Sequence, residues 1–482
     1  MQNPYFQNQS CDPFTPVSKP CELGNMADYS IRIAGAKDVR AAMDFAHQKR
    51  VRLSIRNTGH DYLGRSSGKG SLSLWTQGLK SRQIIKRYSS PAYTGPAVKL
   101  GAGVTAGEAL EFASSSGYRV VTGECGTVGI VGGYSQGGGH GPLNGAYGLA
   151  ADNVLEWELV TGKGEVIVAT PHNKHKDIWW ALSGGGGGTY GVVLGATLRL
   201  HPEGPVVNPS LGFGVGGNVT VDLYWEAVTM FFGLIPDLFR GSNDSAQFTT
   251  WNDNIGILFT MPDQTRATAE ESLAPLLQGL ADLGVPYFLD YAEHETFLDS
   301  YATLYGPLPY GRQPPTTLLS SRIVPAKVLR DAASLDKFID AVKLTTAQGD
   351  FKVDCSAADV DRHGQRVADN GVHPAWRESY VGCNTLGFWN FTAPLAHNYA
   401  TKHRMNTLYA PAWDAATPGA GVYNNEMDPG YVGDFKKNLW GDNYDRLYSV
   451  KSRNDPRRLF YGYFAVGSDD FEIDGAGRLC DA

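Results

Sequence analysis

Three glycine-dense segments near the start of this chain constrain its fold more than any other feature. They cover residues 56–66, 123–148 and 184–191, and glycine makes up 58 of the 482 residues. Glycine permits positive φ angles and lets a ligand approach backbone N–H groups, so such clusters are typical of cradles for an anion or a cofactor. Tight turns between strands are the alternative. Neither a Rossmann fingerprint nor a Walker A loop is present, so the residues alone predict a cofactor-binding domain of another type.

Length and composition exclude several classes of protein. A chain of 482 residues exceeds the size of about 250–300 residues at which one hydrophobic core stops growing, so at least two domains are expected. Hydrophobic residues make up 42%, which excludes wholesale disorder. The net charge is −7 without any basic run, so no nucleic-acid partner is expected. No stretch approaches the about 18 apolar residues of a membrane span, so we expect a soluble protein with no membrane partner.

The first third of the chain reads as alternating short helices and strands. Apolar spacing predicts a helix over Asp38–Lys49 and a strand over Val51–Ile55. A second helix is predicted over Ala106–Ser115. Thr161-Gly162-Lys163-Gly164 predicts a hairpin turn, and Gly191–Leu200 a further strand. These elements fit one α+β domain.

The middle of the chain has longer elements, which predict an antiparallel sheet covered on one face by helices. The expected elements, in order, are a strand pair over Phe248–Met261, a helix over Thr265–Leu283, a strand over Leu318–Ile323, a helix over Ala326–Gln348 and a strand over Phe351–Asp354. A short tail follows, with a helix over Asn443–Ser452 and an aromatic strand over Leu459–Ala465. The predicted domains are 1–204, 205–424 and 425–482.

Two reactive side chains lie within the glycine segments. His60 follows Gly59 in a polar turn, and Cys125 lies within Gly123-Glu124-Cys125-Gly126. Taken singly, such a histidine is most often a surface or hydrogen-bonded residue, and such a cysteine a half-cystine or an inert small residue. Neither has the Cys-x-x-Cys or His-x-x-x-His spacing of a zinc site, so no metal is expected.

The same segments resemble the motifs of a known family. Arg56-Asn57-Thr58-Gly59-His60, followed by Gly64-Arg65-Ser66, resembles the first motif of the vanillyl-alcohol oxidase (VAO) superfamily of FAD-linked oxidases. Its berberine bridge enzyme-like branch is indicated by further segments that match its motifs, namely Gly123–Gly129, Gly137–Gly139, Tyr147–Leu149, Asp177–Val193 and, in the tail, Asn425, Asp455-Pro456 and Phe460. The resemblance spans most of the first domain and the tail.

This resemblance implies a two-subdomain FAD-binding domain of the PCMH type and a substrate domain whose antiparallel sheet covers the flavin. It implies that His60 is joined to the 8α-methyl group and Cys125 to ring carbon 6 of a bicovalent FAD. Val128 would lie beside the flavin carbon that reacts with O2. The other residues implied to hold the cofactor are Arg56, Asn57, Thr58, Gly59, Asp61, Ser66, Gly129, Gly133, Tyr134, Gly138, Gly139, Gly148, Val193 and Asn425.

The chain departs from the family pattern near the expected catalytic base. Many members carry Asn-Tyr in the tail, whereas this chain reads Tyr423-Asn424-Asn425-Glu426. We therefore expect the base to be Tyr423 or Glu426, the ionisable members of the segment. The alternative for Glu426 is a solvated surface carboxylate. Trp376, Tyr380 and Trp389 of the middle region are either sugar-stacking platforms or ordinary core.

Several features favour secretion. The segment from Cys11 to Cys21 and the sequence Ala465-Val466-Gly467-Ser468 resemble fungal secreted members of the family, and four Asn-X-Ser/Thr sequons occur, at Asn8, Asn218, Asn243 and Asn390. We expect a secreted, disulfide-containing glycoprotein whose signal peptide is absent from this sequence. If Cys125 binds the flavin, five of the six cysteines remain, so at least one is unpaired or bridges outward.

The function implied by the resemblance is that of an oxidase. A small alcohol, carbohydrate or secondary metabolite would be oxidised by FAD while a base takes the hydroxyl proton, and O2 would be reduced to H2O2. One alternative is a dehydrogenase with another acceptor. A second is a natural-product cyclase with little net redox turnover. The expected partners are the substrate and O2, and the expected state is a monomer.

Overall fold

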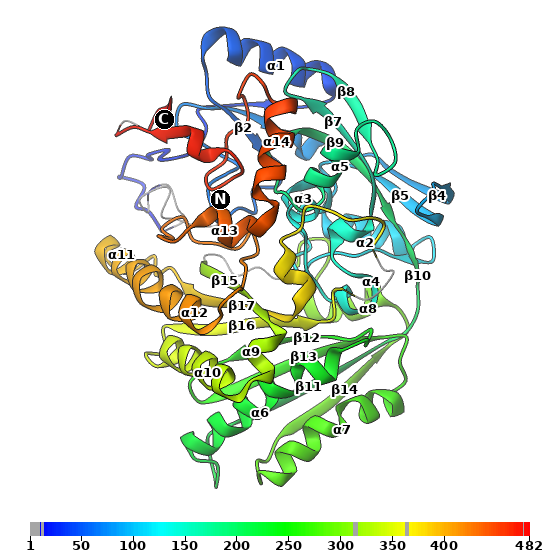
Figure 1. Cartoon of the computed structure of the whole chain (residues 1–482), viewed down its shortest axis with the longest axis vertical. Coiled ribbons are helices and arrows are strands. Elements are labelled where there is room, and N and C mark those ends of the chain that lie inside the picture. The colour runs from blue at the N-terminus through cyan, green and yellow to red at the C-terminus, as the bar shows by residue number, and fades with distance from the viewer. Residues whose placement is uncertain (1–9, 11–13, 312–316, 362–365, 476) are drawn as a thin grey trace.

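A computed structural model describes residues 10, 14–311, 317–361, 366–475 and 477–482. Two halves lie one above the other, and the C-terminal segment returns to the half that contains the N-terminal strands (Figure 1). Each half has a large core of its own. The predicted α+β fold class is confirmed.

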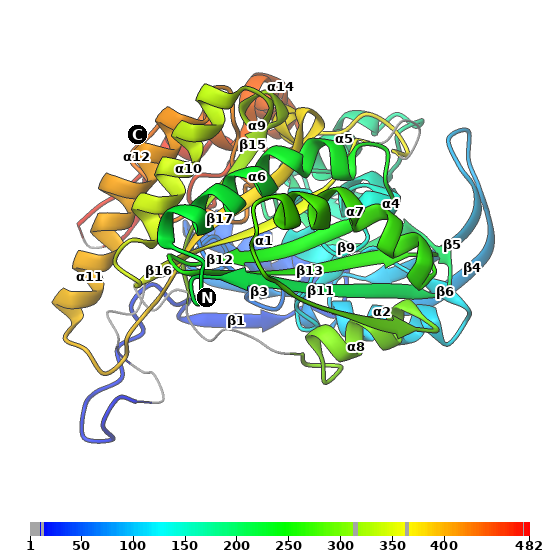
Figure 2. The same cartoon turned by 90° about the horizontal axis from the view of Figure 1, so that it is seen from below.

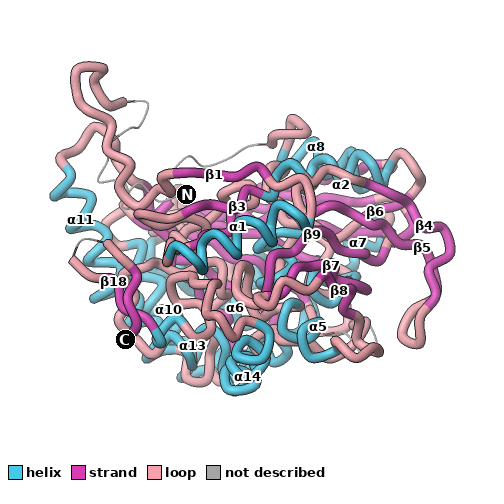
Figure 3. Tube along the Cα trace, turned by 90° about the horizontal axis from the view of Figure 1, so that it is seen from above, coloured by secondary structure: helices cyan, strands magenta, loops and turns pink. Residues whose placement is uncertain are grey.

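The first half contains a parallel sheet, a five-stranded antiparallel sheet and the short antiparallel pair β10-β6. A parallel sheet has the order β1-β3-β2 and is covered by helix α1. An antiparallel sheet has the order β4-β5-β9-β7-β8, and its β4–β5 hairpin extends from the edge of the molecule (Figure 3). The bounds are β1 Tyr29–Arg32, α1 Ala36–Lys49, β2 Leu53–Arg56, β3 Leu72–Trp75, β4 Arg82–Ser89, β5 Thr94–Gly101, α2 Ala106–Ser114, β6 Tyr118–Arg119, α3 Ser135–Gly137, α4 Asn144–Tyr147, β7 Val154–Thr161, β8 Val166–Ala169, α5 Lys176–Leu182, β9 Gly191–Arg199 and β10 His201–Pro202.

The second half is built on a seven-stranded antiparallel sheet of order β14-β11-β13-β12-β16-β17-β15. Helices α6, α7 and α10 lie along one face (Figure 2) and bury the alternate apolar side chains of the strands. The bounds are β11 Val206–Gly214, α6 Val221–Phe239, β12 Ser245–Thr250, β13 Asn254–Pro262, α7 Arg266–Asp282, β14 Phe288–His294, α8 Phe297–Tyr305, β15 Thr317–Pro325, α9 Ala326–Arg330, α10 Ala332–Thr346, β16 Phe351–Ala358, β17 Ser379–Phe388, α11 Leu395–Arg404 and α12 Ala410–Ala416.

The helix predicted over Ala326–Gln348 is two helices, α9 and α10. They are separated at Asp331, whose backbone is extended and whose carboxylate accepts a hydrogen bond of 2.9 Å from the N–H of Ser334. An aspartate that binds the third N–H of a following helix is a typical N-cap, so a new helix begins there.

The C-terminal segment packs against the first half. It contains α13 Phe435–Trp440, α14 Tyr444–Asn454, β18 Phe471–Ile473 and β19 Leu479–Asp481. Leu447 and Val450 of α14 lie in the core of the first half. The aromatic strand predicted over Leu459–Ala465 is wrong. Phe460 forms one isolated bridge with Leu53 of β2, no ladder continues from it among the described residues, and side chains bind several carbonyls of the segment. Lys451 donates to the carbonyl of Phe460, and Arg65 donates to those of Tyr463 and Phe464.

A disulfide joins Cys355 to Cys383, which face each other across the β16–β17 pair. Cys480 is a free, exposed thiol. Within the described ranges, no helix is long and apolar enough to cross a membrane. The same residues contain no cluster of histidine, cysteine and acidic side chains that could hold a metal ion.

Candidate active site

A large cavity lies between the glycine loops of the first half and the C-terminal segment. It encloses about 1350 Å³ of space, counting its opening to solvent. The lining residues that the sequence predicted are Asn57, Thr58, Gly59, His60, Asp61, Ser66, Cys125, Val128, Gly129, Gly133, Tyr134, Val193, Tyr423, Asn425 and Glu426.

Close backbone packing explains why the loops of this cavity need glycine. The amide of Asn57, directly after β2, donates hydrogen bonds to the Thr76 hydroxyl and to the Ala102 carbonyl. A Cβ atom at Gly129 would lie 1.8 Å from Oδ1 of Asn57, so a larger residue would expel the amide. At Gly59, φ is +88°, a conformation that L side chains rarely adopt.

His60 and Cys125 both line this cavity. Nε2 of His60 lies 2.8 Å from the Thr127 hydroxyl, and burial lowers the pKa of His60 to about 4, so its imidazole is neutral at pH 7. Burial, followed by the charge of Glu124, raises the pKa of the Cys125 thiol to about 12. The two predicted linkage residues therefore present a neutral imidazole and a thiol to the same space.

Four predicted cofactor residues, Arg56, Gly138, Gly139 and Gly148, do not line the cavity. The carbonyls of Gly138 and Gly139 accept hydrogen bonds from the N–H groups at residues 151 and 150, so this backbone is engaged within the first half. Gly148 has φ +74° directly after α4, and its carbonyl accepts from the Asn144 amide.

Tyr423 and Glu426 lie on the cavity wall, but their side chains differ in ionisation. The Tyr423 hydroxyl accepts a hydrogen bond of 2.8 Å from Asn425, and burial raises its pKa. Burial opposes ionisation of Glu426, yet the charge and hydrogen bond of His140 lower its pKa below the ordinary value. Glu426 is therefore the carboxylate that is ionised at neutral pH, and it is not a solvated surface group.

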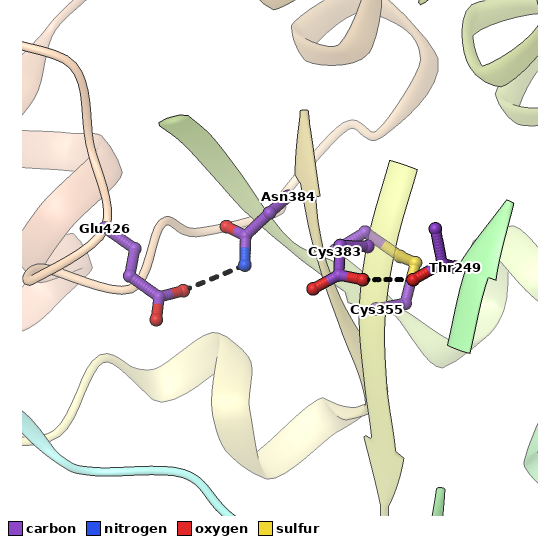
Figure 4. The surroundings of a disulfide bond; sticks show 6 residues. Thr249, Cys355, Cys383, Asn384 and Glu426 are labelled. Carbon is purple, nitrogen blue, oxygen red and sulfur yellow. Dashed lines mark hydrogen bonds between the residues drawn. A yellow bond between two sulfur atoms is a disulfide. The ribbon is translucent and has the colours of Figure 1, made fainter. Parts of the chain in front are cut away.

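Two partners that the sequence analysis missed hold the carboxylate of Glu426. Nε2 of His140 lies 3.0 Å from Oε1, and the Asn384 amide donates a 3.1 Å hydrogen bond to Oε2. Figure 4 shows Asn384 pointing from its strand toward Glu426 while its neighbour Cys383 points away into the disulfide. That opposition is the normal alternation of side chains along a strand. His140 directly follows the Gly137–Gly139 run, and its place beside this motif was the one sequence feature that could have pointed to it.

Glu124 is a further buried carboxyl that the sequence analysis did not select. It lines the cavity directly before Cys125, and burial raises its pKa to about 7. The aromatic residues Trp376, Tyr380 and Trp389 do not line this cavity. Trp376 and Trp389 are buried in small hydrophobic clusters, and Tyr380 packs against the core of the second half. Trp389 belongs to the core, whereas Trp376 and Tyr380 line a second, smaller cavity, so for these two residues the choice between core and sugar-stacking platform stays a prediction.

Comparisons with known proteins agree on one family. Residues 27–170 match the family described as FAD binding domain, and residues 422–462 match that described as berberine and berberine like. The VAO-type flavoprotein oxidase VAO615 of Thermothelomyces thermophilus is 44% identical over 480 residues, which cover 99% of this chain and 82% of the relative. This chain belongs to the berberine bridge enzyme-like branch of the VAO superfamily. It is an FAD-dependent oxidoreductase.

Further relatives of this berberine bridge enzyme-like protein extend the comparison. The bifunctional decalin synthase calF of Penicillium decumbens is 40% identical over 482 residues, covering 100% of this chain and 83% of the relative. The crystal structure of the VAO-type flavoprotein MtVAO615 from Myceliophthora thermophila C1 has a TM-score of 0.95 and 43% identity, and the match covers 100% of this chain and 87% of that one.

The residues of the cavity fit FAD. Loops rich in glycine line it, and the backbone N–H groups of such loops can bind the negatively charged pyrophosphate. Oδ1 of Asn57 and Oε1 of Gln136 are buried at its wall without a hydrogen-bond partner among the described residues. Buried acceptors without partners are costly, and the hydroxyl and amine groups of a dinucleotide can satisfy them.

Proposed function

We propose that this enzyme oxidises a hydroxyl group of a small molecule, such as an alcohol, a carbohydrate or a secondary metabolite, and passes the electrons to O2. Its FAD would be attached covalently to His60 and Cys125. One observation carries the proposal: the two predicted linkage residues and the ionised carboxylate of Glu426 line the same cavity. FAD, when bound, supplies the two-electron chemistry that amino acid side chains lack.

Glu426 has the properties of the catalytic base. A base must be ionised before it can take the hydroxyl proton, and a pKa below the ordinary value keeps Glu426 ionised at neutral pH. The hydrogen bonds from His140 and Asn384 fix the orientation of both oxygens. Tyr423, with its pKa raised by burial, is protonated under the same conditions and serves to shape the wall.

The relative calF supports a second candidate. It is named a bifunctional decalin synthase, and its match covers the full length of this chain. On this alternative, the cavity would hold a natural product during cyclisation, and the net transfer of electrons to O2 would be small. A dehydrogenase with another electron acceptor is the remaining possibility from the sequence analysis.

A screen for peroxide release separates these functions. The holoenzyme is incubated in air with panels of alcohols, saccharides and phenolics, and H2O2 is measured with a coupled peroxidase. The oxidase proposal predicts peroxide in proportion to substrate consumed. Flavin bleaching without peroxide, and slow recovery of the flavin colour in air, would favour the dehydrogenase. Product formation without bleaching or peroxide would favour the cyclase.

A further inference from the structure

His140 lies between the large cavity and a second, smaller one, because it lines both. The second cavity is lined by His140, Gly141, Pro142 and Asn144 of the first half and by residues of the second half, most of them on strands β12, β13, β16 and β17. It has room for a water molecule. Its lining includes Ser245, Gln247, Ser356, Trp376 and Ser379.

The two ring nitrogens of His140 have different surroundings. Nε2 contacts Glu426 at the large cavity, at 3.0 Å. Nδ1 is buried and has no hydrogen-bond partner among the described residues. Ser379 lines the second cavity, and its hydroxyl is also buried without a hydrogen-bond partner among the described residues. A water molecule in this cavity has polar groups to bind, and an imidazolium needs an acceptor at Nδ1.

The ionisation of His140 depends on Glu426. Burial alone would lower the pKa of His140, but the charge and hydrogen bond of the Glu426 carboxylate, together with the charges of Glu124 and Asp354, raise it to about 9. At neutral pH, Glu426 and His140 are thus a carboxylate and an imidazolium with no net charge. If Glu426 were protonated while His140 kept both protons, the pair would hold an uncompensated buried charge, which is unfavourable.

We propose that His140 exchanges a proton with the second cavity each time Glu426 gains or loses one. This inference rests on the proposed function, in which Glu426 is the base. The substrate O–H bond breaks and a carboxyl O–H bond forms on Glu426. The Nδ1–H bond of His140 breaks at the same stage, and its proton passes to water in the second cavity. Nε2–H remains on the ring and still donates to Glu426, so the pair stays neutral.

The return step restores both groups. H2O2 forms from O2 with the two electrons and the proton removed from the substrate carbon, plus one further proton, which Glu426 supplies. Glu426 is then ionised again, and His140 regains a proton at Nδ1 from the second cavity. Over a full turnover the protons balance. His140 therefore acts as a positioning residue that compensates charge, and the second cavity is its connection to solvent.

Histidine NMR tests the coupling without any substrate. Holoenzyme labelled with 15N-histidine is compared with H140Q, which identifies the signals of His140. At pH 7 we expect both nitrogens of His140 to be protonated in the wild type. In E426Q, where the amide can still accept from Nε2–H, we expect a neutral ring protonated at Nε2. A neutral ring in the wild type, or a charged ring in E426Q, would overturn the proposal.

Proton release tests the route. A compound found in the peroxide screen is mixed anaerobically with the holoenzyme in weak buffer containing a pH indicator, and flavin bleaching is followed at the same time. The wild type should release about one proton per reduced flavin, whereas H140Q should release none. S379L, which fills the second cavity, should make proton release lag behind bleaching. S379A keeps the cavity open and should show no lag.

Matched controls make each outcome decisive. Flavin absorbance and thermal unfolding show whether each variant is folded, and S379A controls for loss of the hydroxyl at the same position. Absence of proton release in the wild type, or simultaneous release and bleaching in S379L, would contradict the route through the second cavity. If no compound bleaches the flavin, the proposed function fails, while the NMR comparison still decides whether His140 follows the charge of Glu426.

Discussion

Arg377 forms a buried bidentate ion pair with Asp152, through nitrogen–oxygen distances of 2.7 and 2.9 Å. Asp152 belongs to the first half, where it also accepts a hydrogen bond from the N–H of Leu149. Arg377 belongs to the second half and lies in the short helical turn Pro374–Glu378, immediately before β17. Asn370 donates to the same carboxylate. This pair connects the glycine-rich part of the first half to the strand that carries Asn384.

We expect Arg377→Met to destabilise the protein strongly, because the Asp152 carboxylate would remain buried without its partner. Breaking such a pair costs about 3–5 kcal/mol. Urea unfolding measures the change. Arg453→Met is the control, since the ion pair of Arg453 with Asp177 is exposed and such pairs contribute about 0–1 kcal/mol. Equal losses in the two variants would show that the buried pair has no special role.

The covalent linkages predict the fate of the flavin on denaturation. Acid-precipitated wild-type protein should stay yellow, because FAD would be attached through His60 and Cys125. Each single alanine variant should retain flavin through the remaining bond, and the double variant should release all of it. Mass spectrometry of flavin peptides identifies each attachment. Release of the flavin from the wild type would refute both linkages.

The assignment of Glu426 as base predicts unequal effects of two conservative variants. Loss of a general base lowers a rate by typically about 10² to 10⁴-fold, so Glu426→Gln should slow anaerobic flavin reduction by that factor. Tyr423→Phe should have a much smaller effect, because its phenol is already protonated. Stopped-flow absorbance gives both rates. Near-wild-type reduction in both variants would reject the assignment.

The pH dependence of flavin reduction follows from the same carboxylate. A base acts while ionised, so its contribution is lost as pH falls through its pKa. Because the pKa of Glu426 is lowered, we expect the reduction rate to persist through neutral pH and to fall in acid, below the ordinary glutamate pKa of about 4.3. A fall centred near pH 7 would point instead to Glu124, whose pKa is raised to about 7 by burial.

The expectation that His60 and Cys125 bind the flavin rests on the resemblance of their glycine-rich segments to family motifs. Gly59 precedes His60, and Cys125 lies within Gly123-Glu124-Cys125-Gly126, so each of these motifs is contained within a few neighbouring residues. The partners of Glu426 were not predictable in this way. His140 lies 286 positions from Glu426 in the sequence, and Asn384 is on a strand without any motif. Only the packing of one half on the other brings the three residues together.

The predicted strand over Leu459–Ala465 failed for a related reason. Aromatic and apolar residues favour strands, but a strand needs a partner for its backbone. Here one isolated bridge joins Phe460 to Leu53, and the long side chains of Arg65 and Lys451 bind carbonyls of the segment. Arg65 is distant in the sequence, and its guanidinium also donates to the carbonyl of Asn424, close to the proposed base. The local sequence of a segment does not show whether distant side chains will bind its backbone carbonyls, so the absence of a strand here could not be predicted from it.

The sequons predict N-linked glycans if the protein is secreted. Asn218, Asn243 and Asn390 are all exposed, whereas Asn8 lies outside the described residues. We expect protein secreted by a fungal host to lose mass on treatment with an N-glycosidase. Exchange of each asparagine for glutamine should remove one glycan from the mass spectrum. An unchanged mass after the enzyme treatment would contradict both glycosylation and the expected secretory route.

The size of the side chain at position 128 should affect how fast the reduced enzyme reacts with O2. Val128 lines the large cavity, while its N–H donates to the Cys125 carbonyl and its own carbonyl accepts from Ala106. With the backbone held on both sides, the additional methylene of leucine would have to enter the cavity, and packed sites are sensitive to a change of that size. We expect Val128→Leu to slow reoxidation much more than reduction, as measured by stopped-flow mixing of reduced enzyme with oxygenated buffer. Equal reoxidation rates would exclude a gating role for Val128, and slow reoxidation of the wild type itself would favour a dehydrogenase over an oxidase.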